Sequence, residues 1–152
     1  MNYRLILLIS ASLFVACAES NNGLLTPSVK TSFETIIKIG LFKGQNGFTT
    51  TGNFEIKRND TSFVETFVTW KDFVIDSSAG NVELYLTDDM GAVDLSLATI
   101  VLKLGNITSG FSGEIKFVIP NNNSESFNYA VLYSPSVQLN LGSALIILPQ
   151  PN

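Results

Sequence analysis

Few side chains in this sequence could do chemistry. The 152 residues include no histidine and one cysteine, Cys17. Histidine is the commonest metal ligand and the usual general base near neutral pH, so chemistry that depends on an imidazole is excluded. Asp88, Asp89 and Asp94 lie close together in the sequence, and hard cations take several oxygen ligands. Their spacing matches no calcium-binding loop known to us, so we interpret them as a solvated turn and predict no metal site.

Two further patterns bear on catalysis. Gly105, Gly110 and Gly113 resemble a phosphate-binding loop, but no Lys-Ser or Lys-Thr pair follows them and no helix is expected to begin there. We therefore expect these glycines to permit turns. A carboxylate pair for glycoside hydrolysis depends on the fold rather than on sequence spacing, so that possibility stays open. The residues predict a protein that is not an enzyme, with no catalytic residue and no cofactor; residues that would bind a cofactor are unknown.

The cysteine ends a segment typical of export signals. One positive charge in MNYR precedes the apolar run Leu5–Ala16, which is the layout of a secretory signal peptide. The run is shorter than the roughly 20 apolar residues that span a bilayer. Phe14-Val15-Ala16-Cys17 resembles the lipobox of bacterial lipoproteins, so we predict cleavage before Cys17 and lipidation of that residue. The alternative is an ordinary signal peptide cut after Ala18; either cleavage leaves the mature chain without a free thiol.

The chain is expected to contain one folded domain behind this signal. Pro27 and an Asn-Asn-Gly run favour a tether before the domain. Ala18, where an aspartate would favour the inner membrane, favours the outer membrane. We expect a lipid-anchored cell-envelope protein whose partners are the membrane and an envelope protein or ligand, and not nucleic acid, because the net charge is −4. The predicted parts are a lipoprotein signal peptide at 1–16, a flexible tether at 17–32, a β domain at 33–148 and a tail at 149–152.

From residue 33 onward the pattern is typical of β-strands. Apolar and polar residues alternate between turn signals, and β-branched and aromatic residues are frequent. The segment 93–104 is ambiguous between strand and short helix, and its β-branched residues favour a strand over 99–104. We expect an all-β fold, an antiparallel sandwich or barrel of about eight or nine short strands. The strand-like segments are 33–42, 48–56, 62–70, 82–86, 99–104, 114–119, 127–133 and 137–148.

The same periodicity predicts the core. In the first strand Phe33, Ile37, Ile39 and Leu41 are expected to share one face. The aromatic residues at strand periodicity are interpreted as core rather than as a ligand-stacking surface. They are Phe33, Phe54, Phe63, Phe67, Trp70, Phe73, Phe117 and Tyr129.

Two runs in the second half carry a more specific pattern, LGNITSGFSGEIKFVIP from Leu104 and YAVLYSPSVQLNLGSALI from Tyr129. They resemble the bacterial form of the electron-transfer DM-thirteen domain, which occurs in Skeletor-type proteins, often beside DOMON domains. The likeness covers about residues 40–147. The positions in register include Leu104, Gly105, Ile107, Gly113, Phe117, Ile119, Pro120, Val131, Leu132, Tyr133, Leu139, Gly142, Ala144 and Leu145.

The resemblance implies electron transfer, but the chain departs from the family at the residue that matters most. The family's characteristic cysteine corresponds to Ser134, and the aromatic positions after it are Val137 and Leu141. A serine hydroxyl forms neither a sulfenic acid nor a disulfide. Haem is poorly supported as well, because histidine is absent and Met90 is the only methionine after the signal peptide. We expect the Ser134 hydroxyl to bond to backbone near a strand end.

Two hypotheses of different classes follow. The first is a lipid-anchored, non-catalytic β domain that binds a partner or ligand at the cell envelope. The alternative is a redox or electron-transfer domain like the family it resembles, which would need a non-thiol cofactor here. A hydrolase would need a pair of carboxylates on a concave surface of the fold.

Overall fold

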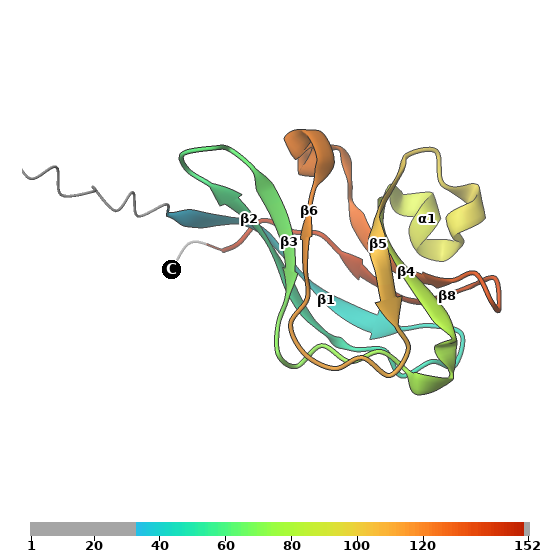
Figure 1. Ribbon diagram of the computed structural model, residues 1–152. Helices are drawn as coiled ribbons and strands as arrows, with labels where there is room; N and C mark the ends of the chain where they lie inside the picture. The colour runs from blue at the N-terminus through green and yellow to red at the C-terminus, as the bar shows by residue number, and fades with distance from the viewer. Residues whose placement is uncertain (1–32, 151–152) are drawn as a thin grey trace, which may run out of the picture. The chain divides into compact units, whose positions relative to one another are not determined.

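The domain is an antiparallel β structure, as the sequence predicts (Figure 1). The computed structural model describes residues 33–150. Short helical turns fill several connections, and one of them, α1, is a single α-helical turn. The strands are β1 (Glu34–Gly44), β2 (Gly52–Asn59), β3 (Glu65–Thr69), β4 (Asn81–Thr87), β5 (Val101–Thr108), β6 (Lys116–Val118), β7 (Tyr129–Ser134) and β8 (Leu139–Leu145). The helices are α1 (Asp89–Val93) and the 3-10 turns η1 (Ser77–Ala79), η2 (Leu95–Leu97), η3 (Pro120–Asn122) and η4 (Ser124–Ser126).

One sheet contains all eight strands and is nearly closed into a barrel. The strand order is β5-β4-β7-β8-β1-β2-β3-β6, and every pairing is antiparallel. The two edge strands, β5 and β6, approach each other within 8 Å between Cα atoms. At this closure the ring of Phe117 lies over Gly105, where a Cβ atom would stand 2.3 Å from the ring. Gly105 therefore lies inside β5 and makes room for an aromatic ring, so its expected role in a turn is wrong. Gly110 and Gly113 have positive φ angles of 72° and 129°, as turns require.

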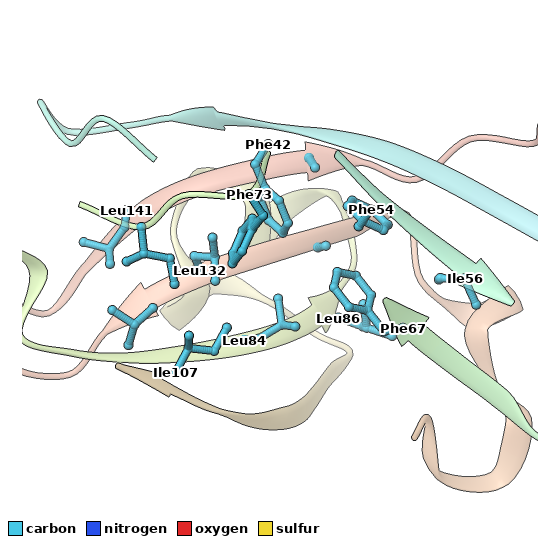
Figure 2. Close-up of a cluster of buried hydrophobic side chains, with 14 of the residues drawn as sticks. Phe42, Phe54, Ile56, Phe67, Phe73, Leu84, Leu86, Ile107, Leu132 and Leu141 are labelled. Carbon is cyan, nitrogen blue, oxygen red and sulfur yellow. The ribbon is translucent and has the colours of Figure 1, made fainter. Parts of the chain in front are cut away.

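The core fills the interior with side chains from both halves of the chain (Figure 2). Phe54 and Phe67 stack with ring centroids 4.5 Å apart, and Phe42 contacts both Phe54 and Phe73. The opposite wall is aliphatic, with Leu84 and other residues of β4, β5, β7 and β8. Inward and outward positions alternate along β4, which is the period-2 pattern of a sheet with one buried face, whereas every residue of β3 is buried. The fully buried large side chains are Phe42, Phe54, Ile56, Phe67, Phe73, Ile75, Leu84, Leu86, Ile119, Leu132 and Leu141.

Several predicted core residues lie at the surface. The register between β1 and β2 shifts between Ile36 and Lys38, and Ile37 packs against the core there. This irregularity changes which residues of β1 face inward, so Leu41 is 49% exposed while Phe42 is buried. The expected single face of β1 is therefore wrong. The aromatic residues that were expected in the core but are exposed are Phe33, Phe63 and Trp70, while Phe117 and Tyr129 are half-buried.

The segment between β4 and β5 combines both structures considered for it. Its beginning forms α1 and η2, and the strand begins at Val101 and runs to Thr108. The strand favoured over 99–104 is therefore confirmed in part, with its start two residues later and its end four residues later.

Candidate functional site

The clearest hollow in the domain lies where β1 and β8 separate. The two strands pair at one end through Lys43 with Ser143, and at the other through an isolated bridge of Ile39 with Ile147. The bridge has two backbone hydrogen bonds of 2.9 Å. The same register would pair Leu41 with Leu145 between these ends, but the residues there form no ladder pair. The strands are thus in register at both ends and open in the middle.

The opening arises because β1 and β8 each pair along their length with a different strand. β1 pairs along its length with β2, whereas β8 stays with β7 through pairs such as Tyr129 with Leu145. The ring of Phe54 closes the opening from the core side. Its Cε1 and Cζ atoms lie 2.4 Å from the position that a Cβ atom on Gly40 would occupy. Gly40 is required at this point, because any side chain there would displace the ring that forms the floor.

The opening forms an apolar groove with a volume of about 710 Å³, and the Phe54 ring is its floor. Ligand sites in proteins commonly have volumes of roughly 300–1,000 Å³ and a mainly apolar lining. One wall includes Leu41 and Trp70, which are 49% and 47% exposed, and the other includes Leu145, which is 52% exposed. Three large apolar side chains from β1, β8 and the end of β3 thus remain in contact with solvent around one concave surface. Contiguous exposed apolar surface of this kind marks interaction sites.

Polar groups gather at the end of the groove where β1 and β8 pair again. Lys43, Gln45 and Ser143 line it there. Within residues 33–150 no carboxylate lies within salt-bridge distance of the Lys43 ammonium group. The Gln45 amide nitrogen donates to the Ala92 carbonyl at 3.1 Å and to the Ser143 hydroxyl at 3.0 Å. Its oxygen, Oε1, is buried and has no hydrogen-bond partner among the described residues. The groove therefore combines apolar walls with a cation at one end.

Ser134 lies at the end of β7 and is fully buried. Its hydroxyl donates to the backbone carbonyl of Ala79 at 2.6 Å, which confirms the expected bond to backbone. Of the two family aromatic positions, Val137 is an exposed residue of the β7–β8 turn and Leu141 is part of the core. A buried hydroxyl bonded to a carbonyl links η1 to β7.

The three aspartates considered for metal binding accept hydrogen bonds from the protein, and Asp89 accepts one from the Asn128 side-chain amide at 3.0 Å. Asp88 caps α1 by accepting from the Gly91 N–H, and it also accepts from the Thr99 N–H at 2.8 Å. Asp94 caps η2 through the Ser96 N–H. Burial raises the pKa of Asp88, but these backbone hydrogen bonds outweigh it and leave that pKa below its ordinary value. Within residues 33–150, no group of three or more acidic, histidine or cysteine side chains is arranged to hold a metal ion.

The sequence did not indicate the ion pair that a buried carboxylate, Glu65, forms with the partly exposed Arg58. Glu65 on β3 is fully buried; Arg58 donates to its Oε1 at 2.5 Å, and the Ser124 N–H donates to its Oε2 at 2.9 Å. Burial raises the pKa of Glu65, but the hydrogen bonds from Ser124 and Arg58 outweigh it and lower that pKa overall. The alternation along the strand, which puts Glu65 on the same face as Phe67, was the feature of the sequence that could have indicated a buried carboxylate. All the polar atoms of this carboxylate are occupied, so we interpret it as structural.

Comparisons with protein-family models, with curated proteins and with solved structures found no match to this chain. The resemblance to the DM-thirteen domain therefore remains a prediction. Cys17, the predicted signal peptide at 1–16 and the predicted tether at 17–32 lie outside the described residues. No helix among residues 33–150 is long and apolar enough to cross a bilayer.

Proposed function

We propose that this protein is a lipid-anchored, non-catalytic domain of the cell envelope that binds an apolar ligand in the groove between β1 and β8. The observation that carries the proposal is the opening of the β1–β8 ladder above Phe54, with Leu41, Trp70 and Leu145 exposed around it. Full burial of a large apolar side chain is worth roughly 1.5–3 kcal/mol, so the half of each of these three side chains that remains exposed is unfavourable by about half that amount. A bound apolar group would recover part of that free energy.

The ends of the groove indicate what shape of ligand it suits. The apolar walls favour a hydrocarbon chain, and Lys43 at the polar end favours an anionic or strongly polar head. The ligand class we propose is an amphipathic molecule with one apolar chain.

The anchor rests on the N-terminal sequence. Phe14-Val15-Ala16-Cys17 after a charged start and an apolar run supports acylation of Cys17 and attachment to the outer membrane. Native mass spectrometry of the chain extracted gently from its own membranes tests this part. A mass equal to residues 17–152 plus acyl groups supports the anchor, whereas a lipid-free mass starting at Glu19 contradicts it.

The redox alternative has the resemblance behind it and no observation from the described residues. The hydroxyl of Ser134 is buried and already donates to the Ala79 carbonyl, and serine has no thiol chemistry. Visible absorbance of the extracted protein, together with additional bound mass in the same spectrum, would favour electron transfer over ligand binding.

Groove binding is testable with dodecanoate, because the chain contains one tryptophan and it lines the groove. The full chain, reconstituted in nanodiscs, is titrated with dodecanoate while Trp70 emission is recorded. We expect saturable binding that Leu145→Asn weakens at least about tenfold, since removing a buried leucine contact costs more than about 1.4 kcal/mol. Dodecanol, which lacks the anion, should bind more weakly than dodecanoate.

Leu139→Asn is the matched control, because Leu139 is an exposed leucine of the same strand outside the groove. It should bind dodecanoate as the unsubstituted chain does. Equal weakening by both substitutions, or a Trp70 signal that does not saturate, would contradict binding in the groove.

A further inference from the structure

The end of the barrel at which the described chain begins has an unusual surface. β1 starts at Glu34, and the carbonyl of Phe33 accepts a hydrogen bond of 3.0 Å from the Asp60 N–H in the β2–β3 turn. Glu34 pairs with Asn59 at the end of β2. Figure 1 shows the start of β1 and the β2–β3 turn at the same end of the domain. The point at which the chain enters the domain is thus attached to this turn.

The β2–β3 turn is held rigidly by Asn59. Its side-chain oxygen accepts from the N–H groups of Thr61 and Ser62 at 3.0 and 2.9 Å, and its backbone bonds to Phe63 and Val64. Phe63 has a φ of 58°, a left-handed conformation that is a genuine outlier for a bulky side chain. Strain of this kind persists where the surrounding structure imposes it and is a reason to look for a function.

The strained residue gains little burial in return. Phe63 is 63% exposed, Val64 in the same turn is also exposed, and Phe33, whose carbonyl bonds to this turn, is 69% exposed. We call these three residues the aromatic end. Glycine or asparagine would suit the backbone at position 63, and a polar side chain would suit its exposure. Two phenylalanines in water at the same turn are unfavourable for the isolated domain and favourable for an apolar surface that covers them.

Two ion pairs lie near the aromatic end, and one carboxylate there has no cationic partner among the described residues. Arg58 contacts Glu65 and Lys116 contacts Glu34 at 3.3 Å, whereas Asp60 accepts a hydrogen bond of 2.9 Å from the neutral Thr35 hydroxyl. Both of these cations are paired, which leaves little to attract an acidic partner, whereas the interface of a bilayer accepts aromatic side chains at the boundary between head groups and acyl chains.

We propose that the aromatic end lies on the membrane surface, with the rings of Phe33 and Phe63 at the boundary between head groups and acyl chains. This rests on the proposed lipid anchor. The predicted tether, residues 17–32, immediately precedes Phe33 in the sequence, and a linker of that length would span roughly 20 Å. The lipid would therefore hold the aromatic end close to the bilayer and orient the β7–β8 turn, at the opposite end of the barrel, away from it.

Quenching by lipids brominated on the acyl chain tests the orientation. Trp70→Phe removes the only tryptophan, and Phe63→Trp then places one at the aromatic end. The matched control is Val137→Trp in the same background, because Val137 is exposed in the β7–β8 turn. The full chain is reconstituted in phosphatidylcholine vesicles with and without bromine. We expect bromine to lower the emission of position 63 at least about twofold and to leave position 137 unchanged.

The outcomes separate this inference from the anchor on which it rests. Flotation of the chain with the vesicles reports the anchor, and a Cys17→Ser chain that no longer floats confirms that report. Flotation with quenching at position 63 alone supports the proposal. Flotation with equal quenching at both positions, or with none at position 63, overturns the proposal and leaves the anchor standing. A chain that does not float overturns both. A third result would also overturn the proposal. If the emission of the tryptophan at position 63 shifts to the blue without lipid, and more so as protein concentration rises, a second copy of the chain covers this end.

Discussion

Gly40→Ala is the substitution that tests the groove most directly. The added Cβ atom would lie 2.4 Å from two ring carbons of Phe54 and 2.8 Å from the carbonyl oxygen of Leu145. Carbon atoms in favourable contact are roughly 3.5–4.0 Å apart, so the ring must move by about 1 Å. Phe54 is buried and stacked on Phe67 at a centroid distance of 4.5 Å, which leaves it little room.

The expected loss of stability follows from two opposing effects. Overpacking of a tight core costs about 1–3 kcal/mol. Alanine recovers about 0.4–1 kcal/mol, because it restricts the unfolded chain more than glycine does. The free energy of unfolding should therefore fall by up to about 2.6 kcal/mol, and the middle of the range is about 1.3 kcal/mol. Because Phe54 forms the floor of the groove, binding of dodecanoate should weaken in the same variant.

A double-mutant cycle with Phe54→Leu isolates the steric cause. Leucine is shorter than phenylalanine and leaves space for the new methyl group, so Gly40→Ala should cost at least about 1 kcal/mol less in the Phe54→Leu background. Urea unfolding followed by circular dichroism measures all four chains, with Lys43→Ala as a control at an exposed position of the same strand. That control should change stability by less than about 0.5 kcal/mol. Additive effects of Gly40→Ala and Phe54→Leu would refute the contact on which the argument rests.

The same structure also makes predictions for other positions. Gly142→Val should lower the free energy of unfolding by well over about 1 kcal/mol, because even the first added carbon lies 3.0 Å from a backbone oxygen; urea unfolding measures it, and a neutral result contradicts the close contact. Ser134→Ala should cost about 1–2 kcal/mol by leaving a buried carbonyl without its donor, while dodecanoate binding stays unchanged. Phe63→Asn should raise stability by about 0.5–1 kcal/mol, since asparagine tolerates positive φ, and lost stability would show that the ring contributes packing instead. Burial and the hydrogen bond to Glu83 raise the pKa of Tyr85 to about 12. The neutral phenol of Tyr85 therefore contributes stability that is present below about pH 10 and is lost as pH rises through about 12. The phenolate absorbance step at about pH 12 should be missing from Tyr85→Phe.

Acid should also destabilise the domain through its carboxylates. The pKa of Glu65 is lower in the folded chain than in the unfolded chain, and the same holds for Asp76, which four hydrogen bonds from Thr49 and Ser78 stabilise as an anion. A lowered folded pKa contributes stability that is present above the unfolded pKa, near 4, and is lost as pH falls below it. Thermal unfolding should show a falling midpoint below about pH 4, and Asp76→Asn should reduce that fall.

The strands could be predicted because their signal is local. Alternation of apolar and polar residues, with Gly and Asn between the runs, depends on neighbours within a few positions, so segments such as 82–86 and 127–133 were placed near β4 and β7. The expected bond from Ser134 to backbone had the same basis, because a hydroxyl next to a strand end meets backbone carbonyls.

The face of a strand was less predictable than the strand itself. A single irregularity in β1 near Ile37 reverses the inward positions that follow it, and nothing in the local residue types announced it. Leu41 is expected on the inward face of β1 for this reason, whereas Trp70, which follows β3, is expected in the core as an aromatic residue at strand periodicity. Both residues line the groove. The pair of Arg58 and the buried Glu65 was missed because a charged residue at an inward position is ordinarily taken as an exposed one.

What the sequence by itself determined is the β character of the domain, the absence of histidine chemistry, and an N-terminal segment with the pattern of a lipoprotein signal. These depend on composition and on short-range spacing, which need no fold to be read. The tertiary structure decided where the groove lies, because its walls come from β1, β8 and the end of β3, which are far apart in the chain. It also decided that Phe33 and Phe63 share one end, since a hydrogen bond between distant segments brings them together. Both sites depend on long-range strand pairing, and that pairing is a property of the whole sheet.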